Sequence, residues 1–190
     1  MNQPNDQQIE TWAREIRKSD RKAFDSLFRA MYPGLVRFAA SYTREKSSAA
    51  DIVQDTFVIL WQKREQIDSN RSLRAFLYQI VRNRSLNYLR DHANETLSSD
   101  WDDLGRQPSH NPSENPEDSS TVLSARFREW ISNLPERQQE AFKLSRFEGL
   151  DHHEIADVMN ISAKTVNNHI VAALSKLKDE YNQYQNQSNP

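Results

Sequence analysis

The spacing of apolar residues predicts five helices in the first half of the chain. Apolar side chains recur every three or four residues, the period of a helix that buries one face. Pro33 should separate the second helix from the third, because proline interrupts a helix interior. Ser47 or Ser48 should cap the fourth helix, since a serine hydroxyl accepts from free backbone amides. The expected helices cover about 9–18, 23–32, 35–42, 48–66 and 73–90.

The second half predicts four more helices, of which the last two form a helix-turn-helix. The first two cover about 123–134 and 138–147 and end at Pro135 and Gly149. Asp151 caps a short helix, and the turn 160–162 leads into the last one, an arrangement typical of DNA-binding proteins. The polar tail is expected to fray. The expected buried side chains of these last two helices are Ile155, Ala156, Val158, Met159, Val166, Ile170, Ala173, Leu174 and Leu177.

An acidic segment separates the two helical halves. Residues 97–120 combine three prolines with Ser, Asn, Asp and Glu and offer almost no apolar residue to bury, which predicts a flexible linker. With only 3 glycines in 190 residues, the fold class expected is all-α, with two helical domains joined by this linker. The expected boundaries are 1–95 for the first domain, 96–121 for the linker, 122–182 for the second domain and 183–190 for the tail.

Charge and composition exclude several classes of protein. Net charge is −2, distributed as +5 over 1–92, −6 over 93–121 and −1 over 122–190. There is no cysteine for a thiolate metal site, no cofactor motif, and no apolar run long enough for export or membrane insertion, which favours a cytoplasmic protein. The acids of 100–103 and the run 152–154 do not form a catalytic or metal-binding pattern. We expect a protein that is not an enzyme.

Two outward helix faces carry candidate binding chemistry. On the last helix, Lys164, Asn167, Asn168, Val171 and Ser175 point away from the core, where amides and hydroxyls suit base edges and lysine suits a phosphate. The fourth helix has an outward face of mixed acid, amide and apolar groups, which favours docking of a basic partner. The alternative for both faces is a merely solvated surface. The residues of the second face are Asp51, Gln54, Asp55, Val58, Trp61 and Gln62.

The fifth helix predicts a third surface. Its expected core side holds Leu73, Phe76, Leu77, Ile80 and Val81, and another face combines cations with an aromatic ring, a combination that suits a nucleic-acid backbone and its bases. An amphipathic pattern fits only the first half of this helix. The residues of that other face are Arg74, Tyr78, Arg82 and Ser85, with Arg71 just ahead of them.

Two long motifs resemble one family of transcription proteins. The run DIVQDTFVILW from Asp51 to Trp61, followed by RSLRAFLYQIVRNRSLNYLR from Arg71 to Arg90, is similar to region 2 of the extracytoplasmic-function (ECF) sigma factors. LPERQQ from Leu134, FEGLDHHEIA from Phe147 and SAKTVNNH from Ser162 resemble region 4 of the same family. Both motifs occur in the family's order.

The resemblance assigns region 2 two roles. The face of Asp51, Gln54, Asp55, Val58 and Trp61 would bind the clamp helices of the RNA polymerase β′ subunit. The loop around 68–72 and the following helix would melt the −10 promoter element and capture an extruded base, as amides and cations together suit a single strand. The residues implied at −10 are Arg71, Ser72, Arg74, Tyr78, Arg82, Asn83 and Asn87.

Region 4 would read the −35 element of promoter DNA and contact the polymerase β flap. The residues implied are Lys164, Thr165, Asn167, Asn168 and Val171. Because many relatives carry arginines on this face and this chain does not, its affinity for duplex DNA outside the holoenzyme should be weak. An anti-sigma protein often holds such factors inactive, and the sequence leaves open whether this chain has one. The acidic linker would enter a positively lined polymerase channel or act as a passive tether.

Two other functions are consistent with parts of the sequence. A dimeric regulator on duplex DNA would use the helix-turn-helix but would leave the face from Asp51 to Trp61 unexplained. A sigma-like adaptor could bind an anti-sigma factor as a decoy, yet such adaptors usually carry a receiver domain, and no alternation of strands and helices predicts one here.

Overall fold

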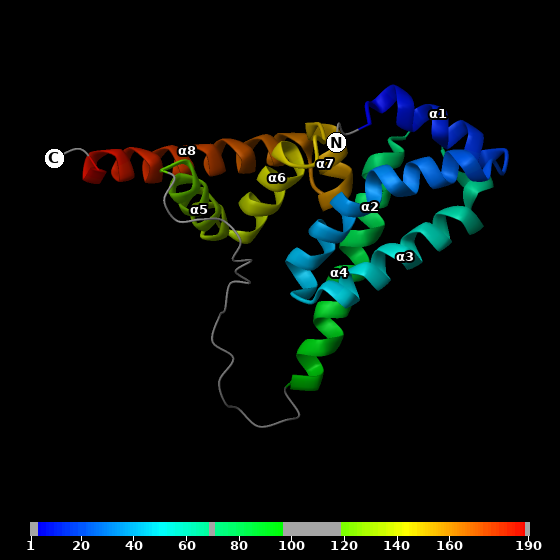
Figure 1. Cartoon of the computed structure of the whole chain (residues 1–190), viewed down its shortest axis with the longest axis horizontal. Helices are drawn as coiled ribbons and strands as arrows, with labels where there is room; N and C mark the ends of the chain where they lie inside the picture. Colours follow the sequence, from blue (N-terminus) through cyan, green and yellow to red (C-terminus); the bar gives the residue numbers. More distant parts are fainter. Residues whose placement is uncertain (1–3, 69–70, 97–118, 189–190) are drawn as a thin grey trace. The chain divides into compact units, whose positions relative to one another are not determined.

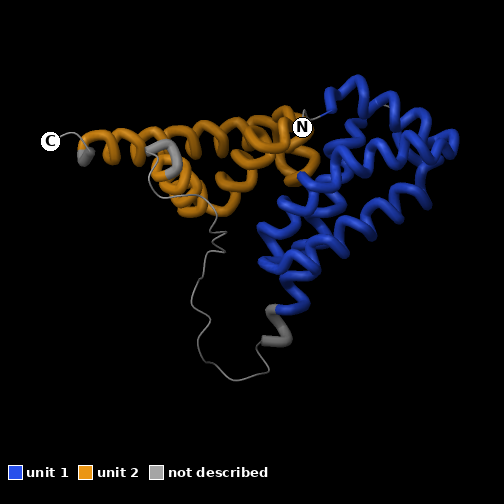
Figure 2. Tube along the Cα trace, in the orientation of Figure 1, with its two compact units in different colours: residues 1–107 blue, residues 108–190 orange. Residues whose placement is uncertain are grey.

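The computed structural model describes residues 4–68, 71–96 and 119–188, and in these residues it contains helices and no strands (Figure 1). The chain divides into two compact units, residues 1–107 and 108–190 (Figure 2). The predicted all-α class is therefore confirmed. The expected linker, 96–121, falls largely on residues 97–118, which lie outside the described part; the helix that follows begins at Ser119.

The first unit consists of four α-helices and one short 3-10 helix. They are α1 (Asp6–Arg17), α2 (Arg21–Thr43), α3 (Lys46–Gln62), η1 (Arg64–Gln66) and α4 (Leu73–Thr96). Helix α2 packs against α1, α3 and α4. The core lies between these helices and includes Leu27, Leu35, Val53, Leu60 and Leu77, each at most 1% exposed.

Helix α2 contradicts the predicted break at Pro33. The helix runs unbroken from Arg21 to Thr43, so the expected second and third helices are one. Leu27 and Met31 before Pro33 are buried, and so are Leu35 and Phe38 after it. Because this apolar stripe continues in register, its burial outweighs the cost of about 3 kcal/mol that an interior proline brings.

The start of α3 also differs from the prediction. Glu45, and not a serine, is the N-cap residue, and Ser47 and Ser48 lie in the first turn. Their hydroxyls donate to the Glu45 carboxylate at 2.6 and 2.7 Å instead of accepting from backbone amides. The helix ends at Gln62, and η1 covers the last residues of the range that was expected to be helical.

The second unit contains α5 (Ser119–Ser132), α6 (Glu136–Arg146), α7 (His152–Met159) and α8 (Ala163–Ser188). One core cluster joins α5, α6 and α8 through Trp130, Ile131, Leu134, Phe142, Ala173 and Leu177. Of the buried residues predicted for α8, Leu174 is the exception at 40% exposed, because it lies beside the buried stripe and not within it.

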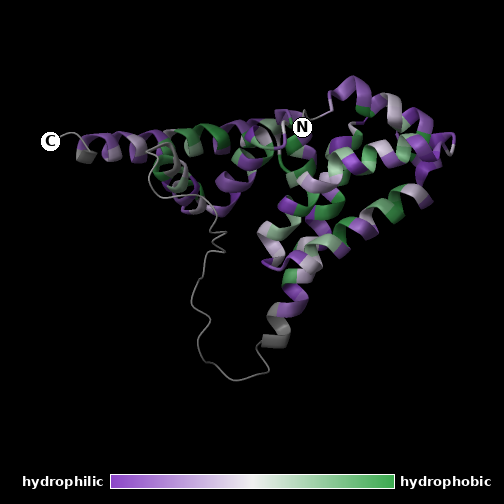
Figure 3. Ribbon diagram, in the orientation of Figure 1, coloured by the Kyte–Doolittle hydropathy of each residue, from purple (hydrophilic) through white to green (hydrophobic). Residues whose placement is uncertain are grey.

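The C-terminal tail is more ordered than expected. Helix α8 continues to Ser188 although its last turns are mostly hydrophilic (Figure 3). Tyr184 packs against the core cluster, with its ring centroid 5.9 Å from that of Trp130. Gln185 donates a hydrogen bond to the Tyr181 hydroxyl at 2.7 Å. These contacts keep in the helix residues that were expected, from their polarity, to form a frayed tail.

Candidate functional site

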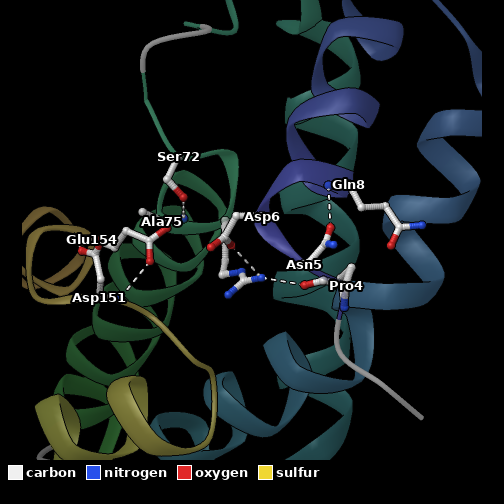
Figure 4. A network of polar contacts seen from close by, with 9 residues as sticks. Pro4, Asn5, Asp6, Gln8, Ser72, Ala75, Asp151 and Glu154 are labelled. Atoms are coloured by element: carbon white, nitrogen blue, oxygen red, sulfur yellow. Dashed lines mark hydrogen bonds and ion pairs between the residues drawn. The ribbon is translucent and has the colours of Figure 1, made fainter.

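The α7–α8 pair has the geometry of a helix-turn-helix. Asp151 caps α7 by accepting from the amides of His153 and Glu154, and the Glu154 carboxylate accepts from the Asp151 amide at 2.9 Å (Figure 4). Asn160 ends α7 in the left-handed conformation, with φ of 54°. Such a residue turns the chain sharply. The predicted cap and turn are confirmed.

The turn delivers the first residues of α8 in a fixed orientation. The Ser162 hydroxyl accepts from the Thr165 amide at 3.1 Å and lies 2.8 Å from the Thr165 hydroxyl. Val166 and Ile170 are buried, so the opposite side of the helix faces solvent. That side contains Lys164, Asn167, Asn168, Val171 and Ser175, all exposed as predicted, while Thr165 is half-buried.

The outward face of α3 is also largely as predicted. Asp51, Gln54 and Asp55 are exposed, and Val58 is 53% exposed. This face therefore presents two carboxylates, an amide and an apolar patch. The Asp55 carboxylate is paired with Arg84 of α4 at 3.0 Å.

Trp61 differs from the rest of this face because it is only half exposed. Its ring lies 5.1 Å from that of Phe24, in a T-shaped arrangement, and the Arg64 guanidinium lies 5.0 Å from its centroid. Part of this side chain thus belongs to an aromatic cluster of α2 and α3, with Phe28 and Phe57 as neighbours.

The predicted surface of α4 is wrong in its orientation. Arg74, Tyr78, Arg82 and Ser85, expected to face outward, are all at most 7% exposed. Tyr78 packs edge-on against Phe38, with centroids 5.2 Å apart. The buried Arg74 guanidinium donates to the Pro4 carbonyl, just before α1, and pairs with the Asp6 carboxylate in the first turn of α1. The apolar pattern alone contains no sign of such partners.

The exposed face of α4 is made by other residues. Phe76, assigned to the core from the sequence, is 38% exposed. Asn83 and Asn87 are exposed as expected, and they follow Phe76 at seven and eleven residues, which places all three on one helix face. Phe76 is the residue that the sequence analysis missed. Extending the helical period backward from the two asparagines would have found it.

The residues ahead of α4 are described in part. Arg71 is exposed and lies 3.9 Å from the Asp68 carboxylate. Ser72 caps α4: its hydroxyl accepts from the Ala75 amide at 3.2 Å (Figure 4), and its carbonyl accepts from the Phe76 amide. Residues 69–70 of this loop lie outside the described part of the chain.

A polar cluster joins the α2–α3 connection to the second half of α4. The Glu45 carboxylate accepts from Ser47, Ser48 and the Tyr88 hydroxyl, and these hydrogen bonds lower its pKa. The Tyr88 ring stacks on His92 with centroids 3.9 Å apart. On α4, this cluster begins at Tyr88, the residue directly after Asn87, and it ties this part of the helix to the start of α3.

The second unit has an apolar groove beside its core. Leu123, Phe127 and Ile131 of α5 line it together with Phe147 and Tyr181, and Ser124 and Arg128 complete the lining. Phe127, Phe147 and Tyr181 are 39%, 48% and 40% exposed. An exposed aromatic patch of this kind is typical of a protein–protein contact.

None of the helices in the described residues is both long enough and apolar enough to cross a membrane.

Comparison with known families identifies both units. The family model for Sigma-70 region 2 matches residues 27–95, and the model for Sigma-70 region 4 matches residues 124–177. Among curated proteins, ECF RNA polymerase sigma factor SigM of Bacillus subtilis is 27% identical over 158 residues, which are 83% of this chain and 94% of SigM. RNA polymerase sigma factor NccH of Alcaligenes xylosoxydans xylosoxydans is 28% identical over 88% of this chain and 91% of its own.

Solved structures share the fold. CnrH, in complex with the cytosolic domain of CnrY, superimposes with a TM-score of 0.62 at 23% identity, over 93% of this chain and 98% of that one. RpoE of Bartonella quintana, in complex with the anti-sigma factor NepR, also gives a TM-score of 0.62 at 23% identity, over 85% and 98%. The chain belongs to the sigma-70 family and is an ECF sigma factor, a promoter-specificity subunit of transcription initiation and not an enzyme.

Proposed function

We propose that this sigma factor binds core RNA polymerase through the exposed face of α3, reads the −35 element through α8 and captures the −10 element through α4 and the loop before it. The observation that carries the proposal is the presence, in one chain, of an outward acidic face in the region 2 unit and an outward amide face on the helix-turn-helix of the region 4 unit. Working on RNA polymerase, it would act in the cytoplasm.

For polymerase binding, we assign Asp51, Gln54, Asp55 and Val58, with the exposed edge of Trp61. Two carboxylates beside an apolar side chain form a surface that complements a basic helix pair with an apolar centre. The clamp helices of the β′ subunit are the partner that the family resemblance implies. The relevant domain would be 1–95.

For the −35 element, we assign Lys164, Thr165, Asn167, Asn168 and Val171, in the domain 122–182. The two amides are able to donate to and accept from one base at once, Val171 suits a thymine methyl group, and Lys164 suits a phosphate. The weakly charged face would depend on the holoenzyme for most of its affinity, because phosphate contacts dominate free-standing binding to duplex DNA.

For the −10 element, the burial pattern changes the assignment. The side chains accessible to DNA are those of Arg71, Phe76, Asn83 and Asn87. The aromatic ring would support unstacked bases, and the amides would read an extruded base. Ser72 holds the start of α4. The buried side chains of Arg74, Tyr78 and Arg82 would support this surface from within instead of touching DNA.

The groove of α5, Phe147 and Tyr181 would receive an apolar segment of polymerase, for which the β flap is the partner implied by the family. An anti-sigma protein would be a second occupant of the two surfaces proposed to bind polymerase, the α3 face and this groove. The structure of Bartonella quintana RpoE is a complex with such a protein, which supports looking for one here.

Run-off transcription with core RNA polymerase and a genomic fragment library tests the proposal. The expected result is a set of new 5′ ends, absent without this protein, that share spaced −35 and −10 elements. If a folded protein gives no new starts, binding to labelled duplex DNA and to an anti-sigma factor separates the two other functions. Duplex binding alone would indicate a regulator, and anti-sigma binding without DNA binding would indicate a decoy.

A further inference from the structure

An ion pair connects the polymerase-facing helix of the first unit to its DNA-facing helix. The Arg84 guanidinium of α4 donates through Nη1 to the Asp55 carboxylate of α3 at 3.0 Å. Helices α3 and α4 pack against each other, so the pair spans the contact between them (Figure 1). Asp55 belongs to the face assigned to polymerase, and α4 carries the surface assigned to the −10 element. A charged partner bound at either surface therefore acts directly on this pair.

Arg84 borders the DNA-facing side of α4. It precedes Asn87 by three residues, a spacing that makes the two side chains neighbours on the helix surface. Asn87 is exposed, and Arg84 is partly exposed beside it. An arginine side chain has many rotamers. Rotation about the bonds of its stem would bring the Arg84 guanidinium from Asp55 toward a strand that contacts Asn87.

The pair is weak enough for Arg84 to exchange its partner. The side chains of Asp55 and Arg84 are 63% and 38% exposed, and water screens an exposed pair, so it contributes little to stability. A guanidinium binds a phosphate with the same fork of N–H donors that it uses for a carboxylate. The same group is therefore able to pass from Asp55 to the DNA backbone when the charge around it changes.

Docking of a basic partner on α3 would change this charge. Cations of the partner would neutralise the Asp55 carboxylate and would lie close to Arg84, where like charges repel each other. In the free chain, by contrast, the Asp55 carboxylate attracts the Arg84 guanidinium and repels a phosphate that approaches it. Bound polymerase and bound DNA should therefore favour the same change, the transfer of Arg84 from carboxylate to phosphate.

We propose that Arg84 is a phosphate contact for the −10 strand, which Asp55 binds in the free chain and polymerase docking releases. This inference rests on the proposed function, because it takes the α3 face as the polymerase surface and the exposed side of α4 as the −10 surface. The released cation would hold the backbone of the strand whose base Asn83 and Asn87 read. Arg84 thus couples the binding of polymerase to the binding of promoter DNA.

The first test measures promoter binding by the holoenzyme over a range of salt concentrations, with the full-length sigma factor saturated by core polymerase and a promoter recovered by run-off mapping. For Arg84→Gln, we expect core affinity within about twofold of the wild type and promoter affinity about three- to tenfold lower. The slope of log affinity against log salt should be smaller by about 0.7–0.9, the value for one phosphate contact. Arg84→Lys keeps the charge and should keep the slope. Arg29→Gln is the matched control and should leave the slope unchanged, since Arg29 forms the same kind of exposed pair, with Asp25 at 3.0 Å on α2.

The second test measures binding of the free chain to a labelled single strand of the same −10 element. Asp55→Ala removes the carboxylate that binds Arg84, so affinity should rise about two- to fivefold, the effect of breaking an exposed pair. The rise should disappear when Arg84→Gln is added, which completes a double-mutant cycle. Asp25→Ala is the matched control: it frees Arg29 in the same way and should change affinity by less than about 1.5-fold.

The role of Arg84 would be overturned by an unchanged salt slope for Arg84→Gln, by a core affinity that falls in parallel with promoter affinity, or by an Asp55→Ala gain that persists in the Arg84→Gln background. Should Arg84→Gln fold poorly in a circular dichroism melt, Arg84→Met, which keeps an unbranched stem, is measured in the same way and judged by the same outcomes. A wild-type protein that yields no new transcription starts would instead contradict the proposed function, so the two failures are distinguishable.

Discussion

Charge reversal on α3 separates polymerase docking from folding. Asp55 forms an exposed ion pair with Arg84 at 3.0 Å, in which the side chains are 63% and 38% exposed. Exposed pairs of this kind stabilise a protein by about 0.2–1 kcal/mol. Asp55→Lys should therefore lower the free energy of unfolding by about 1–2 kcal/mol once repulsion between Lys and Arg84 is included, and Asp51→Lys by less than about 0.5 kcal/mol.

The effect on docking should be much larger. A carboxylate that becomes desolvated against a cationic partner loses about 2–5 kcal/mol when it is removed or reversed. This corresponds to a loss of at least about 30-fold in affinity for core polymerase, since about 1.4 kcal/mol is tenfold. Fluorescence anisotropy of labelled sigma factor with core enzyme, at about 0.15 M salt to screen long-range charge, measures this loss directly.

Asp25→Lys on α2 is the matched control for these variants. Asp25 also pairs with an arginine at 3.0 Å, Arg29, and both side chains are more than half exposed. The control changes the net charge by the same amount and breaks the same kind of pair away from the proposed face. If Asp25→Lys weakens core binding as much as Asp55→Lys does, or if Asp51→Lys and Asp55→Lys both bind normally, the docking assignment is refuted.

Three further predictions address the other features. Asn168→Ala should relax −35 selectivity by about 1–3 kcal/mol while leaving −10 preference unchanged, as measured by transcription from a randomised −35 library. Hydrogen bonds lower the folded-state pKa of Glu45 below its ordinary value of 4.5. They therefore stabilise the protein above that pH, and this stabilisation is lost as the pH falls through the folded pKa. Glu45→Gln should flatten the acid limb of a plot of melting temperature against pH. Pro33→Ala should raise the stability of the first unit by about 1–3 kcal/mol in a urea titration, because Pro33 is exposed inside α2; an unchanged midpoint would mean that the helix has already adapted to the proline.

The helical period predicted most of the fold because most helices bury one regular stripe. The turn around Asn160 and the cap at Asp151 were predictable for the same reason, since their chemistry is local. Pro33 misled the prediction because the cost of a proline is local, whereas the burial that offsets it involves α1, α3 and α4. Local propensity identifies a residue that can interrupt a helix, but tertiary packing decides whether the helix continues through it.

The surface of α4 could not be predicted for a different reason. Arg74 was assigned to a face away from the expected core side of the helix, yet its guanidinium is buried and contacts Pro4 and Asp6, which no pattern within α4 reveals. Once Arg74 and Tyr78 turn inward, Phe76 must turn outward with Asn83 and Asn87. Leu73, Leu77 and Val81 are buried as predicted, so the buried side of α4 is wider than expected and the exposed side is a different one. The exposed faces of α3 and α8 were predicted better, because charged and amide residues there alternate regularly with buried ones.

On the proposed function, each DNA-reading face is able to bind its promoter element weakly because the two faces are joined in one chain. The α8 face has one lysine and two amides, and the accessible α4 set has one arginine, an aromatic ring and two amides, so neither neutralises many phosphates. Two weak contacts on one promoter still bind firmly when the second forms within the same complex, because its effective concentration is set by the connection and not by the solution. A small contribution of phosphate contacts to the affinity then favours selectivity. DNA that carries only one of the two promoter elements loses the affinity gained from linkage. Strong binding of either unit to the DNA backbone would instead hold the polymerase on DNA that lacks the other element.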